Sequence, residues 1–184
     1  MSEKNKSFKE IFLPIIVLVS ICAIIAAAMA AINALTAPKI KADHEKKEQE
    51  ALSIVVPHNQ GFTKLDGIEL PESVLGVYRD NGSASLAVML SVRGYDSSNP
   101  MSVAVGFDEN GKIIKCSVIS CSGETKGIGS KVSGDSFLSQ FYGKNDVSDV
   151  DTITGATISS SAFLTAVEDA CDVVESLRTA EVAK

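Results

Sequence analysis

The residues best placed to do chemistry lie in the stretch 151–157, which reads Asp-Thr-Ile-Thr-Gly-Ala-Thr. Apolar residues then recur at helical spacing, so a helix is expected to begin at or near Thr157. This stripe consists of Phe163, Ala166, Val167, Ala170, Val173, Val174 and Leu177. Unpaired backbone N–H groups and the positive end of the dipole favour an anion at a helix N-terminus. Gly155 and Ala156 are small and leave the Thr157 hydroxyl open, which suits a bound phosphate or a covalent phosphoester.

The same pattern is also typical of an ordinary helix start. Serine and threonine are common N-caps, and glycine is common just before a helix. Spacing alone therefore favours a plain helix cap over a ligand site, because short motifs often match by chance.

Five residues of this stretch form the pattern Asp-x-x-Thr-Gly-Ala-Thr: Asp151, Thr154, Gly155, Ala156 and Thr157. The pattern resembles the flavinylation motif of the FMN-binding family that includes the G component of the Rnf complex and the C component of the sodium-pumping NADH:quinone reductase. In that family a flavin transferase joins FMN, through its phosphate, to the hydroxyl of the last threonine. The resemblance implies that Thr157 carries covalent FMN and that the other four residues help to bind it.

A glycine-rich stretch at 121–129 is the second candidate for cofactor binding. Its glycines would let the backbone approach a ligand, although a plain connecting loop explains them equally well. The family has a similar loop here, His-x-Glu-Thr-Pro-Gly-Leu-Gly. The matching residues are Glu124, Thr125, Gly127 and Gly129. Ser122 replaces the usual histidine and Lys126 the usual proline, and a Lys126 cation beside the flavin would favour its reduced, anionic form.

Composition narrows the classes of partner. The chain has 184 residues and a net charge of −6; three lysines against two glutamates leave residues 1–36 at +1, so the remainder is −7. An acidic domain argues against nucleic acid and against adhesion to an anionic membrane surface. The absence of tryptophan also disfavours nucleic-acid binding by base stacking.

The cysteines and histidines do not predict a metal site. Four cysteines match no zinc or iron–sulfur spacing, and the two histidines have no partner at ligand spacing. Cys116 and Cys121 would face opposite sides of one strand, because an odd number of positions separates them. A disulfide from either to Cys171 is conceivable outside the cytoplasm, but packing thiols are the favoured interpretation.

Residues 11–35 are expected to form a membrane anchor. They include no charged residue, and as a helix they would span roughly 37 Å, more than a ~30 Å hydrocarbon core. A cleaved signal peptide is the alternative, because Ala28-Met29-Ala30 fits a cleavage site, but the apolar run is too long for a typical signal. Lysines on both sides leave the orientation undecided. The resemblance implies that the anchor lies in the plasma or inner membrane. Residues 1–10 would then be cytoplasmic, and residues 59–184 would form an extracytoplasmic FMN-binding domain.

The rest of the chain predicts an α+β domain. Residues 36–58 are expected to form a membrane-proximal helix, with a break or kink at Pro38. Strands are expected at 74–79, 85–93, 101–107 and 112–119, joined as two hairpins with Asn-Gly in each turn. A loop is expected at 60–72 and a short helix at 133–142. Four strands in meander order favour an antiparallel sheet with helices packed on one face.

The resemblance, which covers about residues 95–174, also implies a function. The chain would be an electron-relay flavoprotein subunit of an Rnf-type complex that couples ferredoxin:NAD oxidoreduction to ion transport. Implied partners are multispanning subunits, an iron–sulfur subunit, membrane lipid and, during maturation, a flavin transferase. The cofactor would do the chemistry, so the chain alone is not expected to be a turnover enzyme. Three alternatives stay open: the C component of a quinone reductase, a stand-alone flavin reductase domain, and a membrane-anchored scaffold without flavin.

Overall fold

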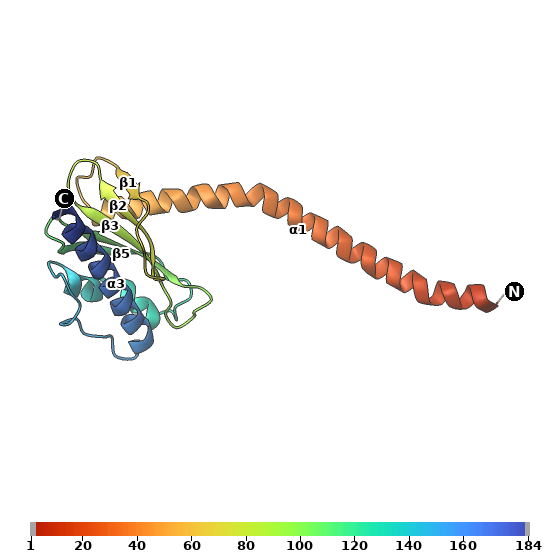
Figure 1. Ribbon diagram of the computed structural model, residues 1–184. Coiled ribbons are helices and arrows are strands. Elements are labelled where there is room, and N and C mark those ends of the chain that lie inside the picture. Colours follow the sequence, from red (N-terminus) through yellow and green to blue (C-terminus); the bar gives the residue numbers. More distant parts are fainter. Residues whose placement is uncertain (1–2, 183–184) are drawn as a thin grey trace. The chain divides into compact units, whose positions relative to one another are not determined.

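The computed structural model describes residues 3–182. The chain divides into two compact units, Met1–Lys46 and Lys47–Lys184. The helix α1 (Glu3–Val55) makes up the first unit and contributes its last turns to the second. All strands and the remaining helices belong to the second unit (Figure 1).

Helix α1 contains the predicted anchor. The described side chains of residues 12–35 are exposed, and the helix is long and apolar enough to cross a membrane. It runs through Pro38 without interruption. Of the break or kink expected at Pro38, the break is therefore absent. A proline removes a single backbone hydrogen bond, and the bonds on either side can continue the helix. The helix ends at Val55, shortly before Pro57, as the restriction on the residue preceding a proline favours.

The second unit is built on a five-stranded antiparallel meander. The strands are β1 (Phe62–Leu65), β2 (Val74–Asp80), β3 (Leu86–Val92), β4 (Met101–Phe107) and β5 (Ile113–Ser120), paired in that order. The four predicted strands are confirmed. The expectation of a loop at 60–72 was wrong in part, because it contains β1. This short edge strand has exposed central residues and half-buried ends, so its sequence carries no alternating apolar signal.

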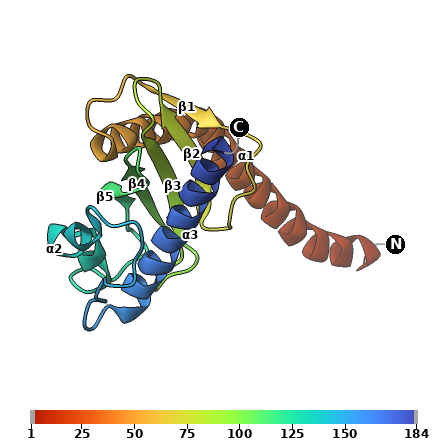
Figure 2. The same ribbon diagram turned by 60° about the vertical axis from the view of Figure 1, so that its left-hand side comes forward.

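Helices cover both faces of the sheet, whereas one covered face was expected. On one face of the sheet, alternate residues of β3 pack in the larger core cluster against α3 (Thr157–Val182). These residues are Leu86, Val88, Leu90 and Val92. Ala87 and Met89 face the other way and pack against the last turn of α1. Figure 2 shows α3 along one face and the end of α1 behind the other. The packing of α1 on the second face was not predicted, because residues 51–56 are too few to show a clear helical stripe.

Gly106 permits the close approach of α1 to the sheet. A Cβ atom at this position would lie 2.2 Å from the backbone oxygen of Val55. We expect Gly106→Ala to lower the free energy of unfolding by about 1–3 kcal/mol, because backbone must shift to relieve the overlap. Urea unfolding measures the change. Gly76→Ala is the matched control, since its Cβ would meet the flexible end of Lys64. Equal stability of the two variants would contradict this account.

The predicted helix at 133–142 is instead three short helical segments. They are η1 (Gly129–Ser133), α2 (Asp135–Leu138) and η2 (Ser139–Phe141). Phe137 and Phe141 pack with Phe163 of α3, each pair of ring centroids being 5.4 Å apart. This aromatic cluster holds the beginning of α3 against the rest of the domain, where the candidate site lies.

Candidate functional site

A pocket of about 430 Å³ brings together the two stretches that the sequence singled out. Residues 155–159, at the start of α3, form one wall. Glu124, Thr125, Ile128 and Gly129, from the loop after β5, form another, and Tyr95 completes the lining. Glu124, Thr125, Gly129, Gly155, Ala156 and Thr157 were all predicted site residues.

The backbone just before α3 turns sharply and presents Thr157. Gly155 has a φ of +84°, which side-chain-bearing residues rarely adopt. The Ala156 N–H donates to the Ile153 carbonyl at 2.9 Å, which closes the turn. The buried Ser160 hydroxyl accepts from the Ile153 N–H at 3.1 Å and donates to the Ala156 carbonyl at 2.9 Å. Ser160 therefore stabilises the turn, while the Thr157 side chain is exposed in the first turn of the helix.

A buried carboxylate links the walls of the pocket. The Glu124 side chain is only 6% exposed. Its Oε1 accepts the Tyr95 backbone N–H at 3.0 Å, and its Oε2 accepts the Ser159 hydroxyl. Charged groups buried in proteins need such partners. Glu124 thus ties the segment after β3 to the first turn of α3.

Two glycines leave the space that this carboxylate occupies. A Cβ atom on Gly94 would lie 2.0 Å from Glu124 Oε1, and one on Gly129 would lie 2.3 Å from Oε2. Gly129, which the sequence suggested as a point of close approach to a ligand, here makes room for a neighbouring side chain. Gly94, Tyr95, Ile128, Ile158 and Ser159 were not predicted, because no local motif marks them.

Four predicted site residues do not line the pocket: Lys126, Gly127, Asp151 and Thr154. Gly127 lies in the adjoining turn, with a φ of +75°, and its N–H donates to the Ser130 hydroxyl at 2.9 Å. The Asp151 N–H donates to the Gln140 side-chain oxygen at 3.0 Å, which holds the loop that leads to α3. Lys126 and Thr154 are exposed.

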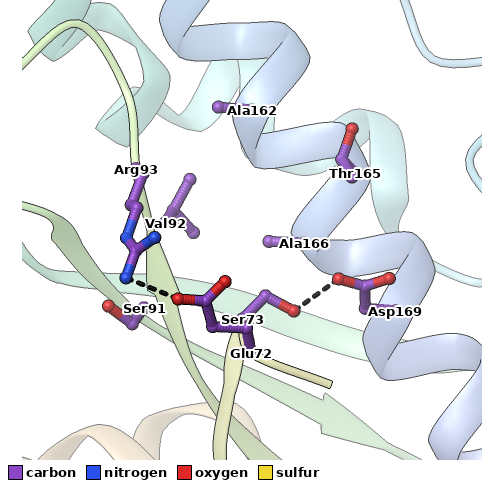
Figure 3. Close-up of a pocket in the computed structure, with 9 residues that line it drawn as sticks. All are labelled: Glu72, Ser73, Ser91, Val92, Arg93, Ala162, Thr165, Ala166 and Asp169. Atoms are coloured by element: carbon purple, nitrogen blue, oxygen red, sulfur yellow. Dashed lines mark hydrogen bonds and ion pairs between the residues drawn. The ribbon is translucent and has the colours of Figure 1, made fainter. Parts of the chain in front are cut away.

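A second pocket, of about 330 Å³, lies farther along α3 and has a different character (Figure 3). Its walls carry polar groups that already pair with one another. Arg93 forms an ion pair with Glu72 at 2.7 Å, and the Ser73 hydroxyl donates to Asp169 at 2.5 Å. None of the predicted site residues lines this pocket.

Two of the four cysteines, Cys116 and Cys171, are packing residues of the core. All four are free thiols, and Cys116 and Cys171 are buried. Burial raises the pKa of Cys116 far above its usual range, and burial also raises the pKa of Cys171 to about 12. Both groups are therefore neutral near pH 7, which agrees with the favoured interpretation of packing thiols.

Comparison with known proteins identifies the class of domain. Residues 94–172 match the FMN-binding domain family, and this segment contains every residue that lines the first pocket. Residues 94–172 are therefore similar to an FMN-binding domain, as the sequence motif had indicated. The chain is also 27% identical, over 93% of its length, to the G component of the proton-translocating ferredoxin:NAD(+) oxidoreductase complex of Clostridium ljungdahlii, of which it covers 95%.

The first pocket suits FMN. Its volume is in the range of about 300–1,000 Å³ typical of small-molecule sites. The start of α3 offers backbone N–H groups for a phosphate, and a Cβ on Gly155 would meet nothing within 4 Å, so this side is open. Tyr95, Ile128 and Ile158 supply apolar surface for a ring system.

Proposed function

We propose that this chain is the electron-relay flavoprotein subunit of an Rnf-type membrane complex that couples ferredoxin:NAD oxidoreduction to ion transport. The observation that carries the proposal is an exposed threonine, Thr157, in the first turn of α3 and within the pocket of an FMN-binding domain. Similarity along nearly the whole length of the clostridial G component supports the assignment to this type of complex. When bound, FMN would supply reversible uptake and release of electrons.

In this proposal FMN is attached covalently, through its phosphate, to the Thr157 hydroxyl. The first N–H groups of α3 would hold the phosphate, and the dipole would contribute about 0.3–1 kcal/mol. Micromolar retention of a free ligand requires roughly 8 kcal/mol, so many further contacts would be needed. A phosphoester removes that requirement for a domain outside the cell.

Mass spectrometry tests the attachment. The full chain is produced with a flavin transferase and digested with trypsin. Cleavage after Lys144 and after Arg178 releases the peptide 145–178. We expect this peptide to carry one FMN on Thr157. A peptide without flavin would overturn attachment at Thr157, and FMN retained without a covalent bond would indicate a different binding mode.

Purification from native membranes tests the proposed complex. We expect the chain to be recovered with an iron–sulfur subunit and multispanning subunits, in a preparation that transfers electrons between ferredoxin and NAD. Recovery with quinone-reducing activity instead would indicate the corresponding component of a quinone reductase. Recovery of the chain without other subunits and without flavin would indicate a membrane-anchored scaffold.

The proposed topology is testable by proteolysis. Residues 1–10 would be cytoplasmic, residues 11–35 would cross the lipid bilayer, and residues 59–184 would lie outside. Protease added to cells stripped of their wall or outer membrane is expected to cleave the domain, as detected with an antibody to the C-terminus. An antibody to a cytoplasmic protein gives the control for intact cells. Protection of the domain until the membrane is opened would reverse the orientation.

A further inference from the structure

Large apolar side chains gather around Thr157. Six such side chains are exposed among the described residues 47–182, and three of them line this one pocket. Tyr95 is 68% exposed, Ile158 61% and Ile128 50%. They come from three separate segments: the loop after β3, the loop after β5 and the first turn of α3. Such a concentration of exposed apolar groups marks a surface that another apolar group covers.

The backbone that carries Tyr95 is held in place. Its N–H donates to the buried Glu124 carboxylate at 3.0 Å, and Gly94 leaves the room for that contact. Glu124 is bonded in turn to Ser159, two residues beyond Thr157. The ring of Tyr95 therefore extends into solvent from a backbone that is fixed relative to the start of α3. An aromatic side chain on such a backbone loses little conformational freedom when a second ring packs on it.

We infer that Tyr95 is the residue on which the isoalloxazine ring of FMN stacks, with Ile128 and Ile158 against its edges. This inference rests on the proposed attachment of FMN to Thr157. A flat, largely apolar ring is complementary to the face of a tyrosine, and aromatic rings attract one another in offset or edge-to-face geometry. The second pocket is less suited to such a ring, because paired charged and polar side chains line it (Figure 3).

The test uses the full chain in detergent, made with a flavin transferase, and three variants. Tyr95→Ala removes the ring, and Tyr95→Phe keeps a ring but removes the electron-donating phenol. Tyr142→Ala is the matched control, because Tyr142 is also exposed but does not line the pocket. Flavin per chain is counted by mass spectrometry. Emission per attached flavin reports contact with the phenol, and quenching by iodide reports how open the flavin face is.

We expect emission per flavin to rise several-fold in both Tyr95 variants, because an excited flavin is quenched by electron transfer from tyrosine and not from phenylalanine. Iodide quenching should rise in Tyr95→Ala but not in Tyr95→Phe, whose ring still covers the flavin. Tyr142→Ala should match the unmodified chain in both measurements. Should Tyr95→Ala fail to acquire flavin, Tyr95→Leu gives the same comparison.

Unchanged emission and iodide quenching in the Tyr95 variants, with FMN still on Thr157, would overturn the stacking inference and leave the proposed function intact. Absence of FMN from Thr157 in the unmodified chain would overturn the proposed function itself. A rise in emission in Tyr142→Ala as large as in Tyr95→Ala would also count against Tyr95, because the effect would then not be specific to the pocket.

Discussion

Thr157→Ala is expected to abolish FMN attachment and to leave the domain folded. The variant lacks the only oxygen that the proposed phosphoester uses at this residue. The side chain is exposed, so its truncation should change the free energy of unfolding by no more than about 0.5 kcal/mol. Flavin absorbance and the mass of the peptide 145–178 measure attachment, and urea unfolding measures stability. An adduct that persists in Thr157→Ala would show that another residue carries the flavin.

Three further variants sharpen this test. Thr157→Ser should retain part of the attachment, because the nucleophilic oxygen remains but is less well oriented without the methyl group. Gly155→Val should also lose attachment, since it places a branched side chain at a φ of +84° beside the acceptor. Thr152→Ala is the control, because Thr152 is exposed, occupies a variable position of the motif and does not line the pocket. An adduct found on Thr125, Thr154 or Ser159 would contradict the assignment.

Gly129→Ala is expected to destabilise the domain by about 1–3 kcal/mol, as overpacking does in a filled interior. The added Cβ would lie 2.3 Å from Glu124 Oε2 and 3.0 Å from the Ser159 hydroxyl. Either the loop moves or the Glu124–Ser159 hydrogen bond is lost. Because Glu124 and Ser159 line the same pocket as Thr157, FMN attachment should fall together with stability.

A double-mutant cycle distinguishes this cause from a general loss of loop structure. Glu124→Ala alone leaves the Tyr95 N–H and the Ser159 hydroxyl without their acceptor, which costs about 1–3 kcal/mol. It also frees the space that the methyl group of Gly129→Ala requires. The combined variant should therefore lose less stability in urea than the two single variants added together. Strictly additive losses would show that Gly129 is required for a reason other than the Glu124 carboxylate.

Local patterns in the sequence predicted the elements that bear the function. The stripe from Phe163 to Leu177 places a helix start near Thr157, because helical spacing repeats within a few residues. Alternating apolar residues and Asn-Gly turns likewise predicted four of the five strands. The uncharged run at 11–35 predicted a helix that could cross a membrane. Each signal depends only on neighbouring residues, and so it can be read without the fold.

Tertiary structure decided how these elements meet. The Glu124 carboxylate binds Ser159, 35 positions away, and that contact depends on how α3 packs across the sheet. The steric need for Gly94 and Gly129 and the position of Tyr95 follow from contacts of the same carboxylate, whose other oxygen accepts the Tyr95 N–H. The packing of the last turn of α1 on the second face of the sheet also depends on a distant contact. Gly106 has no side chain, and the backbone of α1 can therefore approach the sheet closely there. The local motif, through its resemblance to a flavinylation motif, thus predicted Thr157 as the acceptor, whereas the pocket around Thr157 depends on contacts between distant segments that no local pattern encodes.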